Sequence, residues 1–168
     1  MDASLITPFI SSIQNVFSTM MQLPVTVNPP KVKSGAEPSH DVSGIIGMSG
    51  DVTGSVVLSF PLETAKRIVA LFCGEQMEPG TADFADAIGE LVNMVSGGAK
   101  AQFPDNRRVS ISCPSVVLGA NHVVARQTDT PCVLIPCTTD CGELTIEVAI
   151  REAAANAGVD SGARAAAA

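Results

Sequence analysis

The N-terminal part of the chain places apolar and polar residues with the period of a helix. From Ser4 to Leu23 the apolar positions recur every three or four residues, and polar side chains occupy the opposite side. This spacing predicts an amphipathic helix with one buried face. Pro8 is tolerated in the first turn of such a helix, and Pro24, Pro29 and Pro30 are expected to end it.

The period changes in residues 41–60. Apolar and β-branched residues run on both sides of Gly50-Asp51, and further glycines mark bends. This pattern predicts a β-hairpin that turns at Gly50-Asp51.

Two more helices are expected after the hairpin. The first lies between Pro61 and Gly74, because proline suits the first turn of a helix and glycine commonly ends one. The second is capped by Thr81 or Asp83 and reaches about Gln102.

The rest of the chain is typical of short strands. They are expected at Val109–Ser112, Ser115–Leu118, Val123–Arg126, Cys132–Cys137 and Glu143–Ile150, with a last turn at Cys141-Gly142. Long helices together with clustered strands predict an α+β fold, in which an antiparallel sheet of about six strands packs with three helices. Residues 152–168 are small and Ala-rich, so we expect a domain over 1–151 followed by a frayed or disordered tail.

Composition narrows the classes of function. The 168 residues are 46% hydrophobic, which suits one domain with a substantial core. The chain has ten Lys and Arg and seventeen Asp and Glu, which gives a net charge of −7. This charge argues against nucleic-acid and anionic-membrane partners. The absence of Trp and Tyr and the presence of only two His leave little for base stacking or His-based catalysis. Because no basic residue precedes Lys31, a cytoplasmic location is expected.

The five cysteines do not form a recognisable framework. An odd number without a secretory signal predicts reduced thiols. Cys132, Cys137 and Cys141 could in principle be thiolate ligands, but their spacing is not that of a zinc site and no His pair follows. The favoured interpretation is buried small hydrophobes on strands, so we expect the chain to hold no metal.

Polar residues line one face of the helix expected over residues 83–100. At about 100° per residue, Asp86, Glu90 and Asn93 fall within about 60° of one another. The other arc is apolar and contains Phe84, Ile88, Leu91, Val92, Val95 and Ala99. The pair Gly97-Gly98 indicates either a close approach to the backbone or a bend, because glycine weakens a helix. The same stripe is also typical of an ordinary solvated helix face.

The stripe resembles a known signature when it is taken together with a later proline. Asp86-x3-Glu90-x2-Asn93, followed by Pro114, is similar to the motif of the CheX/CheC/FliY phosphatases of bacterial chemotaxis, and of their CheX-like members in particular. The opening PFI…NVF, the hairpin GIIGMSGDVTGSVVLSF and the ending LTIEVAI also resemble CheX-like chains, so the resemblance covers about residues 4–151. Twenty residues separate Asn93 from Pro114, slightly fewer than is usual in the family. A CheX/CheC-like fold with internal pseudo-symmetry is implied.

The resemblance also implies an activity and a partner. Such a protein is a hydrolase that removes the phosphoryl group from the phospho-aspartate of the response regulator CheY. By analogy Asn93 would position the attacking water, Glu90 would dock by pairing with a receiver lysine, and Asp86 and Pro114 would be accessory. The receiver would supply Mg²⁺, so no cofactor belongs to this chain, and a homodimer is implied.

Other interpretations stay open. The same fold could serve as a non-catalytic adaptor that docks a receiver domain, or as a structural component of the flagellar switch. In the first expected helix, Ser12-x-x-Asn15 repeats the spacing of Glu90 and Asn93. It is interpreted either as a degenerate second copy of the motif, because related CheC proteins carry two, or as an ordinary polar helix face, which is favoured.

Overall fold

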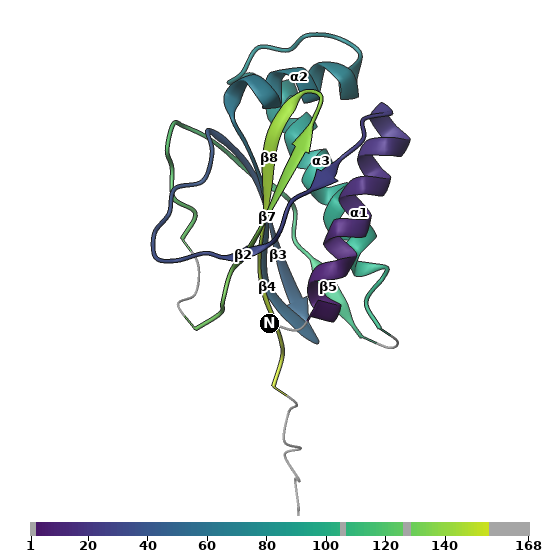
Figure 1. Ribbon diagram of the computed structural model, residues 1–168, viewed down its shortest axis with the longest axis vertical. Helices are drawn as coiled ribbons and strands as arrows, with labels where there is room; N and C mark the ends of the chain where they lie inside the picture. Colours follow the sequence, from purple (N-terminus) through teal and green to yellow (C-terminus); the bar gives the residue numbers. More distant parts are fainter. Residues whose placement is uncertain (1–2, 105–106, 126–128, 155–168) are drawn as a thin grey trace, which may run out of the picture.

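The computed structural model of the protein describes residues 3–104, 107–125 and 129–154. Within them, three helices and eight strands follow one another (Figure 1): α1 Ala3–Met21, β1 Thr26–Val27, β2 Lys31–Val32, β3 Val42–Gly50, β4 Val52–Phe60, α2 Leu62–Cys73, α3 Ala82–Lys100, β5 Val109–Ile111, β6 Ser115–Leu118, β7 Val133–Thr139 and β8 Gly142–Glu152. The expected α+β class is confirmed, with eight strands in place of about six. Of the expected tail, residues 155–168 lie outside the described residues.

The strands form one antiparallel sheet in the order β1-β7-β8-β4-β3-β5, with β2 also paired to β7 and β6 to β3. The predicted hairpin is its centre. It pairs Val42 with Phe60 and Met48 with Gly54, and Asp51 occupies the turn. Gly50 has a φ of 106°, a conformation that favours glycine, which explains why the turn falls there.

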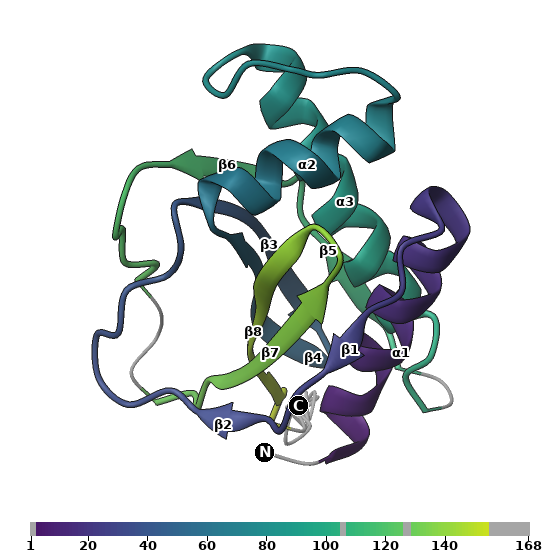
Figure 2. The same cartoon turned by 45° about the horizontal axis from the view of Figure 1, so that its top comes forward.

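Two helices cover one face of this sheet. In Figure 1, α1 and α3 lie side by side against it, while Figure 2 shows α2 crossing one end of the molecule. Alternate strand residues point into this layer and are buried, among them Val56, Leu58, Ile135, Ile146 and Val148. α3 comes close to β3, since an ideal Cβ on Gly44 would lie 3.0 Å from Cγ1 of Val92. The position of α3 is therefore fixed by the core.

The end of α1 is set by its own backbone. Gln22 has a φ of 51°, and its N–H donates to the carbonyl of Ser18, so the helix stops at Met21 before Pro24 is reached. Pro8 lies in the second turn of the helix and is buried, whereas the first turn was expected.

Residues 33–40, here called the strap, cross the other face of the sheet (Figure 1). Nζ of Lys33 lies 2.7 Å from Oε2 of Glu147 on β8, and the Ser39 hydroxyl donates a 2.6 Å hydrogen bond to Oε1 of the same carboxylate. The side chains of Lys33 and Glu147 are only 3% and 8% exposed. One buried carboxylate therefore holds both ends of the strap.

Two expectations about the strands also differ from the structure. Residues 123–125 are not a strand, and Arg126, the last residue of that expected strand, lies outside the described residues. The edge of β3 is already occupied by β5 and β6. His122, just before the segment, contacts the strap, where its carbonyl accepts from the Ser39 N–H at 2.9 Å. The strands β1 and β2 were not expected, because two residues are too few to show a period.

Candidate functional site

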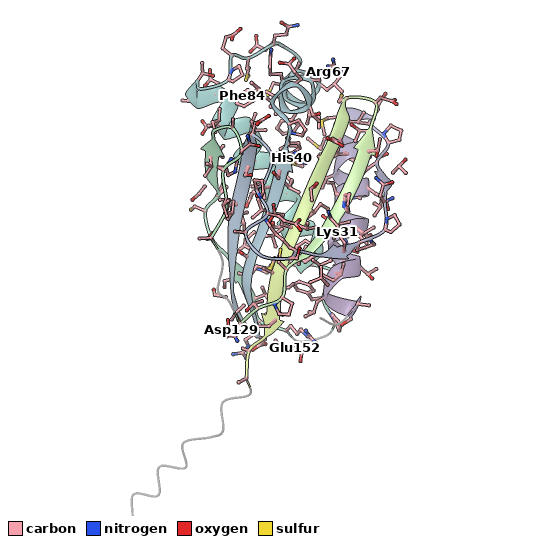
Figure 3. All side chains as sticks on the ribbon, turned by 60° about the vertical axis from the view of Figure 1, so that its left-hand side comes forward. Lys31, His40, Arg67, Phe84, Asp129 and Glu152 are labelled. Atoms are coloured by element: carbon pink, nitrogen blue, oxygen red, sulfur yellow. The ribbon has the colours of Figure 1, made fainter. Side chains whose placement is uncertain are left out.

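Helix α3 carries the candidate site, and its start is fixed by a side-chain cap. The Thr81 hydroxyl oxygen accepts from the N–H of Phe84 at 3.3 Å, so Thr81 is the cap and Asp83 lies in the first turn. Figure 3 places Phe84 toward the end of the molecule that α2 covers. The helix ends at Lys100, two residues before the expected Gln102.

The two faces of α3 separate as the periodicity predicts. All six residues of the apolar arc are buried at 0% exposure: Phe84, Ile88, Leu91, Val92, Val95 and Ala99. On the opposite side Asp86 and Glu90 are exposed, and Asn93 is half-buried. The carboxylates and the carboxamide therefore stand on the solvent side of a helix that the core holds in place.

The three polar side chains of this face have no side-chain partner among residues 3–104, 107–125 and 129–154. Within the described part of the chain, Asp86 and Glu90 enter no ion pair, and the Asn93 carboxamide makes no side-chain hydrogen bond. A carboxamide can both donate and accept, and an ionised carboxylate accepts. Their hydrogen-bonding capacity is available to a partner molecule or to water.

A groove of about 460 Å³ lies between α3 and the start of β6. Its lining comprises Ala85, Asp86, Gly89, Glu90, Pro114 and Val116. The fold thus brings Pro114 beside the two carboxylates of the stripe, although the three are far apart in the chain. Asn93 is not in the lining and follows Glu90 by three residues along the helix.

Gly89 and Val116 belong to this groove and were missed in the sequence. An ideal Cβ on Gly89 would lie 3.2 Å from Cγ of Pro114, so the proline ring rests directly on the helix backbone. The available signal was a glycine in the middle of a helix, where it weakens the helix relative to alanine. Sequence reasoning applied that rule to Gly97 and Gly98 but not to Gly89.

The Ser12-x-x-Asn15 repeat does not form a second exposed pair. Ser12 is 1% exposed, and its hydroxyl donates a 2.7 Å hydrogen bond to the carbonyl of Val95 on α3. Asn15 is exposed on α1. An ideal Cβ on Gly98 would lie 2.4 Å from the Ser12 hydroxyl, which confirms a close approach at that glycine, whereas Gly97 faces open space.

Burial separates the cysteines into two groups. Cys132, Cys137 and Cys141 are buried, while Cys73 and Cys113 are exposed. Loss of water around the Cys137 thiol raises its pKa to about 11, so that thiol is protonated at neutral pH. Across residues 3–104, 107–125 and 129–154, no cluster of three His, Cys, Asp or Glu is arranged to hold a metal ion. No helix in those ranges is long and apolar enough to span a bilayer.

Known proteins are similar to this chain in sequence and in fold. The family model described as chemotaxis phosphatase CheX matches residues 42–138. The CheY-P phosphatase CheX of Thermotoga maritima is 30% identical over 121 residues, which cover 71% of this chain and 78% of that protein. A CheC-like superfamily protein from Shewanella sp. PV-4 superposes with a TM-score of 0.81 at 33% identity, covering 90% of this chain and 99% of the other. The CheX–CheY–BeF3–Mg²⁺ complex of Borrelia burgdorferi gives a TM-score of 0.74 at 22% identity, over 88% and 98% of the two chains, and this likeness concerns the fold.

Proposed function

This chain belongs to the CheX family of chemotaxis phosphatases, and on that premise we propose that it hydrolyses the phospho-aspartate of a CheY-type receiver domain. The observation that carries the proposal is the placement of Glu90 and Asn93. They stand three residues apart on the solvent side of α3, beside the groove, with no partner inside the described part of the chain. A rigid helix presents both to one docked molecule.

The reaction requires little covalent chemistry from the protein. A water oxygen forms a bond to phosphorus while the bond from phosphorus to the aspartyl oxygen breaks. The carboxylate leaves with the electron pair of that bond, and both water protons end on the phosphate. Because an acyl phosphate is an activated group, positioning and electrostatic stabilisation supply the acceleration.

The residues divide this work. The Asn93 carboxamide would accept a hydrogen bond from the attacking water and hold it in line with phosphorus, and as an amide it keeps this role across the physiological pH range. Glu90 would pair with a lysine of the receiver, and Asp86 and Pro114 would help to hold the docked surface. Mg²⁺ would arrive with the receiver, so the chain would need no cofactor of its own; the complex of B. burgdorferi contains CheX, CheY, BeF3 and Mg²⁺ together.

Phosphate release tests the proposal. A CheY-type receiver domain from the same genome, phosphorylated with acetyl phosphate in Mg²⁺, should lose phosphate faster when the protein is added. Asn93→Ala should lower kcat by about 100-fold with KM nearly unchanged, the size seen when one transition-state hydrogen bond is removed. Asn15→Ala is the matched control, because Asn15 is an exposed helical asparagine without a neighbouring carboxylate of the motif.

The outcomes separate the proposed classes of function. A wild-type chain that binds the receiver without accelerating phosphate release would be an adaptor or a switch component. Full activity of Asn93→Ala would contradict the water-positioning role.

We further propose a homodimer in the cytoplasm, where receiver domains are phosphorylated. Light scattering after gel filtration measures the mass in solution. A mass close to the 17.2 kDa of one chain at assay concentrations would contradict the dimer.

A further inference from the structure

We propose that Gly89 is a positioning residue of the groove: because it has no side chain, it lets the ring of Pro114 rest on α3 and so sets the width of the groove beside Glu90. This inference rests on the proposed function and concerns which receiver side chain the groove admits.

The contact with Pro114, and not the backbone, disfavours a side chain at position 89. Gly89 does not have a positive φ, so an ordinary residue would fit its helical conformation. An ideal Cβ would nevertheless lie 3.2 Å from Cγ and 3.5 Å from Cβ of Pro114, and 3.8 Å from Cγ2 of Val116. The first of these distances is shorter than an ordinary contact between carbon atoms.

Pro114 cannot easily move away, because β3 holds the chain on both sides of it. The Ser112 N–H donates to the Gly47 carbonyl at 2.9 Å, and the Ser112 hydroxyl accepts from the Gly47 N–H at 2.9 Å. On the other side Ser115 is the register partner of Ile45. A side chain at position 89 would therefore narrow the groove or displace an anchored loop.

The lining defines the side chain that fits. Ala85, Pro114 and Val116 supply apolar surface, and Asp86 and Glu90 supply two carboxylates. This combination suits an unbranched aliphatic stem that ends in a positive charge. The receiver lysine already proposed as the partner of Glu90 meets this description, with its methylenes on Pro114 and its ammonium group at Glu90.

Substitutions of graded size test this assignment through the split between KM and kcat. We expect Gly89→Leu to raise KM for the phosphorylated receiver by about 10-fold, which corresponds to 1.4 kcal/mol, and Gly89→Ala to raise it less. The kcat should stay within about 2-fold, because the side chain alters docking and not the water held by Asn93. Gly119→Ala is the control, since its Cβ would meet no atom within 4 Å and it lies outside the groove.

A change at Gly89 made in a Pro114→Ala chain tests whether the effect of position 89 on KM acts through the proline ring. In a Pro114→Ala chain, the further change Gly89→Ala should leave KM where Pro114→Ala alone sets it, because the ring carbon that it approaches is gone. Thermal unfolding checks that each variant is folded, and Gly89→Ala, which adds only one carbon, carries the test where Gly89→Leu does not fold.

The same variants are also titrated against the BeF3⁻–Mg²⁺ form of the receiver, so that binding is measured without hydrolysis. An unchanged KM and Kd in folded Gly89 variants, or a loss of kcat alone, overturns the role of Gly89. If the wild-type chain binds the receiver without hydrolysing its phosphate, and Gly89→Leu binds the receiver more weakly than wild type does, the role of Gly89 is supported while the proposed phosphatase activity is contradicted. A wild-type chain that neither binds nor hydrolyses overturns both proposals.

Discussion

The Ser12 hydroxyl donates a 2.7 Å hydrogen bond to the carbonyl of Val95 and thereby joins α1 to α3 inside the core. The approach is close because Gly98, three residues after Val95, has no side chain in the way. The helix that carries Glu90 and Asn93 is thus tied to α1 from its buried side.

Two neighbouring glycines of α3 should respond to alanine in opposite directions. Gly97→Ala should raise the free energy of unfolding by up to about 1 kcal/mol, because its Cβ enters open space and alanine favours the helix. Gly98→Ala should lower the free energy of unfolding by about 1–3 kcal/mol, because it displaces the buried Ser12 hydroxyl from its hydrogen bond. Urea denaturation measures both free energies of unfolding. When Ser12→Ala is added to Gly98→Ala, most of the stability lost in Gly98→Ala should return. Equal effects of the two single changes would contradict the close approach.

Glu90→Gln should weaken docking while leaving the bound reaction intact. The Glu90 carboxylate is exposed and unpaired within the described residues, so its loss removes one surface charge without removing an interaction that stabilises the fold. We expect the Kd for the BeF3⁻–Mg²⁺ receiver to rise by about 10-fold, the cost of losing a charged hydrogen bond in an interface. Calorimetry measures the Kd. Asn93→Ala is the comparison and should change this Kd by less than about 3-fold. A larger rise in Kd for Asn93→Ala than for Glu90→Gln would mean that Asn93 is the docking residue and would contradict the assigned roles.

The strap depends on its buried ion pair. Glu147→Gln should lower the free energy of unfolding by about 3–5 kcal/mol, because it leaves the buried ammonium of Lys33 without its charge partner. Lys66→Ala is the contrast, since the Lys66–Glu63 pair is 43% and 70% exposed and should contribute at most about 0.5 kcal/mol. Both are measured by urea denaturation. A similar loss in the two variants would mean that the Lys33–Glu147 pair is solvated in solution.

The free energy of unfolding should fall in alkaline solution, partly because of the ionisation of the Cys137 thiol. The folded pKa of Cys137 is raised to about 11 from an ordinary value of 9.0, so between these values the unfolded chain loses the proton and the folded chain keeps it. The contribution of Cys137 is therefore complete below pH 9 and declines up to about pH 11 by at most ~1.4 kcal/mol per pH unit. Free energies of unfolding of wild type and Cys137→Ala, compared across this range, should show a shallower decline in the variant. Parallel curves would mean that this thiol is open to water.

The helices and the central hairpin could be predicted from the sequence because their signals are local. The apolar arc of α3 needs only the helical period, and the turn at Asp51 needs only the glycine before it. The stripe of Asp86, Glu90 and Asn93 follows from the same period. For these parts, residues close in the chain decide the structure.

The parts that were missed depend on residues far apart in the chain. Lys33 and Glu147 are separated by 114 positions, and nothing near either of them indicates a buried pair. The contact between Gly89 and Pro114 likewise exists only once β6 lies beside α3. The strand expected at Val123–Arg126 was wrong over residues 123–125, because two other strands already fill the edge of β3.

The two faces of α3 have an evolutionary consequence. The residues that anchor the helix in the core are not those on its solvent side, so the solvent side is free to change while the fold persists. If the proposed roles hold, one substitution at Asn93 in a duplicated gene would be enough to yield a stable protein that occupies receivers without clearing their phosphate. On the same proposal, such a competitor would protect the phosphorylated receiver that its parent dephosphorylates, and the two proteins would differ at a single residue.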